Sequence, residues 1–413
     1  MREMKNSGFE WIGTIPCHWN LTRIANLYRV RNQKVSDKDF PPLSVTMKGI
    51  VPQLETAAKT NDGDNRKLVR IGDFAINSRS DRRGSCGISA LDGSVSLINT
   101  VLMPLSEMNP RYYNWLFHTV QFADEYYKCG HGIVDDLWTT TWQEMKKIVI
   151  PTPPLDEQKK IAEFLDVKCS EIDALIADIQ AQIETLEQYK RSTVAEAVTK
   201  GINPNVSMKY SGAGWLGDIP AHWRVDKFKY RLTRNEPRNP GDKIVLSLYR
   251  ELGIIQKDSR DDNHNQTSED TSKYKYVKPG NFVVNKMKAW QGSVAVSNYE
   301  GIVSPAYYIY KFLDDSFDKR YFHYLLRGCY KDEFMRLSGG MRVGQWDLYA
   351  EDLENTTIII PRIEEQIAIS KYLDEKCTEV DTCAKTKKSQ ITTLEAYKKS
   401  IIFEYVTGKK EVV

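Results

Sequence analysis

The sequence predicts an α+β protein in which two globular α/β domains follow one another along the chain, each with a long helix after it. Three observations lead to this prediction. Apolar residues recur at heptad spacing between residues 155 and 200, the same stretch returns 208 residues later, and short β-like runs alternate with turns in the blocks between. At 413 residues the chain is also too long for a single hydrophobic core. We therefore expect an internal pseudo-two-fold repeat.

The first long helix is expected over residues 155–201. A proline-rich segment, 151–154, prevents an earlier start, and the carboxylates of Asp156 and Glu157 favour the first turn of a helix. Gly201 is suited to end it. About 45 residues at ~1.5 Å each give a helix of roughly 65–70 Å. The heptad seam, which is mostly apolar, consists of Leu165, Cys169, Ile172, Ile176, Ile179, Ile183, Leu186, Lys190, Thr193 and Ala197.

The second long helix, with a short tail, is expected over residues 364–413. It repeats the first helix without a gap, and the identities include polar residues that a heptad pattern alone does not require. The matched polar residues include Glu157 and Glu365, Gln158 and Gln366, Asp166 and Asp374, Lys168 and Lys376, Asp173 and Asp381, and Lys190 and Lys398. Shared polar positions indicate a duplication.

A tryptophan-rich segment opens each half of the chain. Residues 7–19 recur as residues 211–223, and both contain glycine and proline at matching places. Such a composition is typical of a fixed, irregular segment that packs against another element. His18 and His222 lie in these segments without a metal-ligand pattern around them, so we expect them to be structural.

The two α/β domains are expected over residues 1–154 and 202–363. They share a framework rather than a sequence: Gly72–Asp73–Phe74 with Asn77 corresponds to Gly280–Asn281–Phe282 with Asn285. Each block carries one predicted amphipathic helix, at Pro110–Tyr127 and at Lys319–Met335. The predicted strands are Leu43–Val45, Phe74–Ile76, Ile244–Leu248, Phe282–Val284 and Thr357–Ile360. Two domains that share framework residues but differ in their loops indicate that both recognise the same kind of ligand with different specificity.

Composition limits the class of protein. The sequence contains no run of 18 apolar residues and no apolar signal segment, which argues against membrane insertion and secretion. Seven cysteines without a CxxC pair indicate a reducing compartment, so we expect a cytoplasmic protein. A net charge of +3 is small, so any contact with nucleic acid must depend on local positive charge.

Catalytic motifs are missing from the sequence. There is no glycine-rich phosphate loop, no HExxH sequence and no nucleophile elbow. Asp-x-Lys triplets of a nuclease type occur at Asp166–Lys168 and Asp374–Lys376, but both lie on the predicted long helices. A solvated helix face explains them better than a metal site, and a nuclease remains the alternative prediction.

Basic and polar loops are the candidate functional sites. One follows the strand at Phe74–Ile76, and its counterpart follows the strand at Phe282–Val284. Arginine, lysine and glutamine side chains can read base edges or bind phosphates. The candidate DNA-contacting residues are Ser78, Arg79, Arg82 and Arg83 in the first block, and Lys286, Lys288, Trp290, Gln291, Arg342 and Gln345 in the second.

With these features together, the chain resembles the DNA-specificity subunit of type I restriction–modification systems. The resemblance covers essentially the whole chain. It is carried by Trp-x-Gly-x-Ile-Pro-x-His-Trp at Trp11–Trp19 and again at Trp215–Trp223, and by Ile150–Gln158 leading into Ile161–Asp166.

The resemblance implies two target-recognition domains, each reading one half of a split sequence in double-stranded DNA. It implies that the two long helices pair as an antiparallel coiled coil that sets the gap and docks two methyltransferase subunits. Restriction subunits would complete the complex. It implies no catalysis and no cofactor in this chain, with S-adenosylmethionine, ATP and Mg²⁺ bound by the partners. A coiled-coil scaffold without DNA contact is the second alternative.

Overall fold

The computed structural model describes residues 2–54, 63–79, 82–105, 108–132, 138–241, 243–249, 253–259, 270–340 and 346–412. The chain divides into two compact units. Unit 1 consists of Met1–Gln180 and Lys388–Val413, and unit 2 consists of Ala181–Lys387. Each unit therefore contains one α/β block and a portion of both long helices.

Unit 1 begins with short strands and ends its α/β block with a strand that leads into the first long helix. Its elements are β1 (Met4–Asn6), β2 (Thr14–Pro16), β3 (Asn20–Arg23), the 3₁₀ turn η1 (Ile24–Asn26), β4 (Tyr28–Val30), β5 (Lys34–Val35), β6 (Leu43–Thr46), β7 (Gly49–Pro52), β8 (Arg66–Val69), β9 (Phe74–Asn77), β10 (Cys86–Ile88), β11 (Gly93–Val95), β12 (Asn99–Pro104), α1 (Pro110–Phe117), α2 (Val120–Lys128), α3 (Trp142–Met145) and β13 (Val149–Thr152).

Unit 2 repeats this order. Its elements are β14 (Met208–Tyr210), β15 (Asp218–Pro220), β16 (Arg224–Lys227), η4 (Phe228–Tyr230), β17 (Leu232–Arg234), β18 (Leu246–Tyr249), β19 (Gly253–Gln256), η5 (Lys257–Ser259), β20 (Lys275–Val277), β21 (Phe282–Asn285), η6 (Ala289–Gln291), β22 (Val294–Val296), β23 (Gly301–Val303), β24 (Tyr307–Phe312), α5 (Lys319–Cys329), α6 (Lys331–Leu337), β25 (Ser338–Gly339), β26 (Asp347–Leu348), α7 (Ala350–Asn355) and β27 (Thr357–Ile360).

The central sheet has the same strand order in both units. It runs β10-β9-β12-β4 in unit 1 and β22-β21-β24-β17 in unit 2, and all its pairs are antiparallel. The side chains of β9 alternate between the two faces of the sheet, and all four of its residues are buried. Phe74 and Ile76 join the main core of unit 1, whereas Ala75 joins a smaller cluster with Val101.

Each predicted amphipathic helix is two helices in the structure, so the single-helix predictions were wrong. In unit 1 the break lies at His118 and Thr119, and the Thr119 side chain accepts a hydrogen bond from Phe122 N and caps α2. In unit 2 Tyr330 separates α5 from α6. The apolar pattern continues across both breaks because both helices of a pair face the same core.

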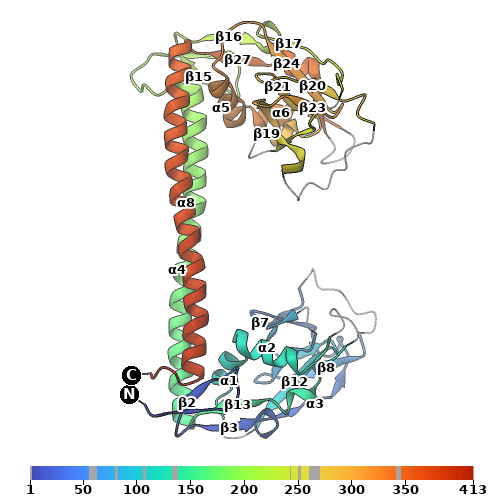
Figure 1. Cartoon of the computed structure of the whole chain (residues 1–413), viewed down its shortest axis with the longest axis vertical. Helices are drawn as coiled ribbons and strands as arrows, with labels where there is room; N and C mark the ends of the chain where they lie inside the picture. The colour runs from blue at the N-terminus through green and yellow to red at the C-terminus, as the bar shows by residue number, and fades with distance from the viewer. Residues whose placement is uncertain are drawn as a thin grey trace. The chain divides into compact units, whose positions relative to one another are not determined.

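The long helices are α4 (Leu155–Lys200) and α8 (Ile363–Val406), and their portions in each unit lie side by side (Figure 1). In unit 2, Lys190 Nζ donates to Asp381 at 2.7 Å and Lys387 donates to Gln182. In unit 1, Lys398 Nζ donates to Asp173 at 2.6 Å, and the rings of Phe164 and Tyr405 lie 4.4 Å apart.

Residue numbers rise along one helix as they fall along the other, so the pairing is antiparallel in each unit. Seam residues such as Leu165, Ile172, Ile179 and Ile183 are buried, as the heptad pattern predicts. The predicted fold class, with its antiparallel helices and internal repeat, is confirmed.

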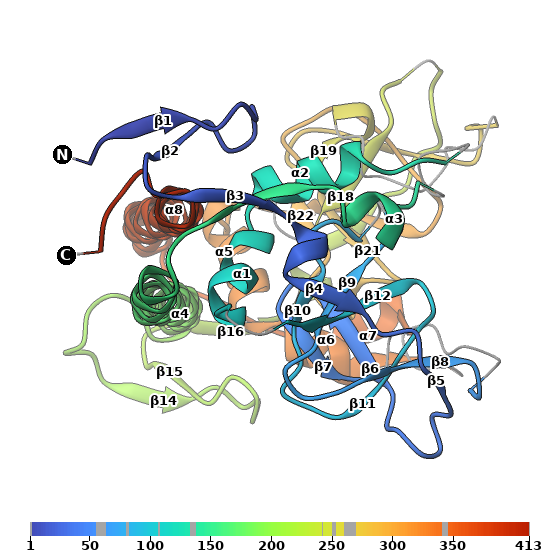
Figure 2. The ribbon, with the colours of Figure 1, turned by 90° about the horizontal axis from the view of Figure 1, so that it is seen from below.

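Each α/β block is attached to both long helices by matching contacts. In unit 1, α1 lies between the helices and the four-stranded sheet (Figure 2), and Tyr112 donates its hydroxyl to Val406 O at 2.6 Å. In unit 2, Tyr321 donates to Val198 O at 3.0 Å. Gln158 at the start of α4 is buried and accepts from Asn109 N. These contacts fix each block on the helices.

The tryptophan-rich segments contact the first turn of the long helices. His18 Nε2 lies 2.6 Å from Glu157, and His222 Nε2 lies 2.9 Å from Glu365. The expected structural role of both histidines is thus confirmed. No helix within the described residues is long and apolar enough to cross a membrane.

Candidate nucleic-acid interface

Hydrogen bonds hold the backbone of the loop after β9 at the point where it leaves the sheet. Ser78 N donates to Ile98 O at 3.2 Å, and Ser78 O accepts from Thr140 N at 3.0 Å. One residue further on, Arg79 N donates to the Asn77 side chain at 3.0 Å. The main chain at Arg79 is therefore held by bonds to its own strand and to two distant segments.

The loop after β21 is held by the same bonds. Lys286 N donates to Ala306 O at 3.1 Å, and Lys286 O accepts from Leu348 N at 2.9 Å. Met287 N donates to the Asn285 side chain at 3.2 Å. The two units thus present the same backbone at this place, while the side chains differ.

The predicted residues of the first loop separate into two groups. Ser78 is buried, and its hydroxyl donates to the Ile98 carbonyl, so the structure gives it a role inside the domain. Arg79, Arg82 and Arg83 are exposed. Of these, Arg83 pairs with Asp124, and its guanidinium lies 4.6 Å from the centre of the Tyr127 ring.

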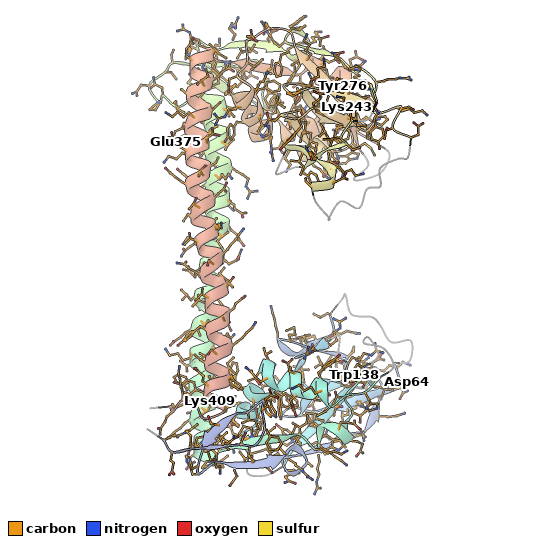
Figure 3. The ribbon with its side chains drawn as sticks, in the orientation of Figure 1. Asp64, Trp138, Lys243, Tyr276, Glu375 and Lys409 are labelled. Atoms are coloured by element: carbon orange, nitrogen blue, oxygen red, sulfur yellow. The ribbon has the colours of Figure 1, made fainter. Side chains whose placement is uncertain are left out.

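Trp138 packs against Tyr127, the residue whose ring lies beside the Arg83 guanidinium. Its indole Nε1 donates to Tyr127 O at 2.9 Å, and the two rings lie 5.7 Å apart. Gly130 allows this approach, because a Cβ there would lie 2.6 Å from Trp138 Nε1. Figure 3 shows Trp138 on the side of unit 1 that is turned away from the long helices.

A hollow in unit 1 is lined in part by Trp138 and Tyr127. Its wall combines apolar and aromatic side chains with two of the predicted arginines. The lining residues include Phe117, Phe122, Tyr126, Tyr127, Trp138, Arg79 and Arg83. Tyr126 donates its hydroxyl to Thr140 O, and burial raises the pKa of Tyr126 well above its usual value, so it stays neutral.

The second loop contains Trp290, which packs against Trp346. The rings of Trp290 and Trp346 lie 5.4 Å apart, and Trp290 Nε1 donates to Met287 O at 3.0 Å. Lys286 pairs with Asp347 at 3.2 Å. Lys288 is exposed and Gln291 is half-buried. The predicted residues Arg342 and Gln345 lie outside the described residues.

Met287 was not among the residues predicted from sequence. It is 51% exposed and occupies the position that corresponds to Arg79. A methionine in a polar loop gives no signal of its own. The repeat spacing of 208 residues, which links Asn77 to Asn285, also links Arg79 to Met287 and could have found it.

The Asp-x-Lys triplets on the long helices are engaged in docking. Asp166 accepts from Trp115 Nε1 at 2.7 Å and pairs with Arg111, while Asp374 accepts from the Tyr324 hydroxyl at 2.7 Å. The lysines pair with glutamates one turn away. Both triplets therefore attach an α/β block to its helix.

Comparison with known proteins decides the family. The profile of the type I restriction modification DNA specificity domain matches twice, over residues 18–185 and 228–393. The chain belongs to the type I specificity family. The two matched ranges correspond to the two repeats that the structure describes.

Relatives and solved structures agree with this assignment. The MjaVIII specificity subunit of a type I restriction enzyme from Methanocaldococcus jannaschii is 26% identical, over 96% of this chain and 94% of the relative. The HsdS subunit of Thermoanaerobacter tengcongensis has a similar fold, with a TM-score of 0.55 and 16% identity, over 98% of this chain and all of that one.

A chain from a structure that describes complex assembly and conformational transition of the type I restriction–modification system is also similar. Its TM-score is 0.71 at 15% identity, over 96% of this chain and 99% of that one. Two tandem target-recognition domains and a DNA-recognition role are thereby confirmed. A specificity subunit is non-catalytic, which excludes the nuclease alternative.

Proposed function

We propose that each unit reads one half of a bipartite site in double-stranded DNA. The observation that carries this proposal is the pair of loops after β9 and β21, which have the same backbone bonds and different side chains. Two loops with the same backbone and different side chains can recognise two different base sequences. The exposed arginines and lysines supply the local positive charge that DNA binding needs.

We propose further that the pair of long helices sets the gap between the half-sites. Helices α4 and α8 each continue without interruption from one unit into the other. The proposed boundaries are 1–154 and 202–363 for the two recognition domains, and 155–201 and 364–413 for the helices with their tail.

Two methyltransferase subunits are the proposed partners on the helices, with restriction subunits completing the complex. Tyr189 and Tyr397 occupy equivalent positions of the repeat and are 52% and 53% exposed. Exposed aromatic side chains are enriched at protein interfaces, and the repeat provides two such places. S-adenosylmethionine, ATP and Mg²⁺ are proposed to be bound by these partners, in the cytoplasm.

The exchange of one recognition block tests the bipartite reading. Residues 20–150 are replaced by the corresponding block of a family member with a different site, and the complex with methyltransferase subunits is expressed in cells. Sequencing that detects methylated adenine should show one changed half-site, with the other half and the gap retained. A matched exchange of residues 224–360 should change the opposite half. Loss or change of both halves after one exchange would contradict the proposal.

A further inference from the structure

We infer that Arg79 and Met287 are specificity-determining residues at one equivalent reading position, where Arg79 contacts a guanine and Met287 contacts an apolar base edge such as the thymine methyl group. This inference rests on the proposed function, since it requires each unit to read one half-site. It assigns a single base contact to each unit.

The first argument is the rigidity of the backbone at this position. In both units an asparagine at the end of the strand, Asn77 or Asn285, accepts from the backbone N–H two residues later. The preceding residue is fixed on both sides, to Ile98 and Thr140 in unit 1 and to the equivalent residues in unit 2. A reading side chain has to start from a fixed backbone, because base contacts tolerate little displacement.

The second argument is the freedom of the side chains. Arg79 is exposed, and its guanidinium forms no hydrogen bond or ion pair with the part of the chain that the structure describes. Arg83 is different, since it pairs with Asp124 and its guanidinium lies over the Tyr127 ring. Arg79 thus combines a hydrogen-bonded backbone with a guanidinium that has no partner among the described residues. Bidentate contact with guanine O6 and N7 is the commonest sequence-specific contact of an arginine with DNA.

The third argument is the nature of the replacement in unit 2. The indole N–H of Trp290 donates to the Met287 carbonyl, and Met287 itself is 51% exposed. Methionine offers an adaptable apolar surface and no hydrogen-bond donor. At the same reading position it suits the thymine methyl group and disfavours the guanine edge.

Reciprocal substitutions test the inference in the assembled complex. Arg79→Met and Met287→Arg are each expressed with the methyltransferase subunits, and methylated adenines are mapped on the host genome. Arg79→Met should lower the preference for guanine at one base pair of one half-site by roughly 5- to 150-fold, the factor equivalent to one bidentate contact. Met287→Arg should create a preference for guanine at one base pair of the other half-site.

Two controls isolate the position. Arg29→Met removes the same charge from β4, at the far edge of the sheet, and should leave the methylated sequence unchanged. Met287→Leu keeps an apolar side chain and should retain the wild-type half-site. Melting temperatures of the purified complexes check that each variant folds.

Three results would overturn the inference. Unchanged sequence preference in both reciprocal variants shows that position 79/287 does not read bases. Weaker binding of Arg79→Met to all sequences alike, with a shallower salt dependence, makes Arg79 a phosphate contact. Changes by both variants in the same half-site contradict one reader per unit. A wild-type complex that methylates no bipartite site would instead refute the proposed function itself.

Discussion

At the scale of single residues, the repeat is visible in the contacts that join the opening segments to the long helices. Glu157 receives hydrogen bonds from His18 and from Trp19 Nε1 at 3.1 Å, and it pairs with Arg2 at 2.8 Å. The equivalent Glu365 is bound by His222. One carboxylate in the first helical turn thus anchors an irregular segment and also complements the helix dipole.

Replacement of Glu157 by glutamine should make this anchor weaker in a pH-dependent way. Burial raises the pKa of Glu157, but the hydrogen bonds from His18 and Trp19 and the charge of Arg2 outweigh it and leave the pKa below its usual value. The carboxylate therefore stabilises the fold fully above its unfolded pKa of ~4.3, and this contribution is lost as the pH falls through the lower folded pKa.

Urea unfolding between about pH 2.5 and pH 7 covers this loss and measures the effect. At pH 7, Glu157→Gln should reduce the free energy of unfolding by about 1.5–3 kcal/mol, the range for a hydrogen bond to a charged group. The deficit should shrink towards the acid end. Glu163→Gln, at an exposed position on the same helix, is the control and should change little. A deficit that is equal at every pH would show that the charge of Glu157 is not responsible.

At the scale of elements, the long helices combine an apolar seam with reciprocal ion pairs. Lys190 pairs with Asp381 and Lys398 with Asp173, and these two pairs are exchanged by the repeat. The side chains remain partly exposed, so each pair is worth at most about 1 kcal/mol. Ile183 is 1% exposed, and such a side chain contributes several times more. The seam dominates the stability of the pairing.

Alanine substitutions should reproduce this order. Ile183→Ala should lower the free energy of unfolding by about 2–5 kcal/mol, because it removes buried methyl groups and leaves a cavity. Lys190→Ala and its repeat equivalent Lys398→Ala should each cost less than about 1 kcal/mol. Unfolding followed by circular dichroism at 222 nm measures all three. A larger loss for Lys190→Ala than for Ile183→Ala would mean that the ion pair, and not the seam, holds the helices.

The long helices were predictable from sequence because their signals are local and repeated. The seam recurs every three or four residues, and the proline segment before Leu155 marks the start of α4. The break between α1 and α2 was missed although Thr119 is a typical capping residue. The apolar periodicity continues across this break, and it was a stronger signal for one continuous helix than Thr119 was for a new helix start.

The candidate site was predictable only in part. The loops after β9 and β21 were found because their glycines and asparagines repeat at a fixed spacing. The burial of Ser78 depends on Ile98 and Thr140, which lie in distant segments, so no local pattern could reveal it. The DNA contacts of the exposed residues stay predictions.

At the scale of the whole molecule, both long helices pass from one unit into the other, and three polar contacts between them can be assigned to one unit or the other. The pairs Lys190–Asp381 and Gln182–Lys387 belong to unit 2, and Lys398–Asp173 belongs to unit 1. Insertions after Ile179 and after Lys387 would therefore not separate the two partners of any of these three contacts. This arrangement allows the proposed role of the helices in spacing to be tested.

The insertion of one heptad into each helix at these two places should lengthen the gap between the half-sites. Seven residues keep the phase of the apolar seam and add about 10 Å to each helix. At ~3.4 Å per base pair this corresponds to roughly 3 bp. The second half-site also rotates by roughly 100°, so the duplex has to twist and some affinity should be lost.

Mapping of methylated adenine should then show the original half-sites with a gap longer by about 3 bp. A two-residue insertion in each helix is the matched control, since it turns the seam by roughly 200° and should weaken the helix pairing without defining a new gap. The original gap, methylated at full strength by the heptad variant, would contradict the spacing role. The helices would then act only as a surface on which the partner subunits dock.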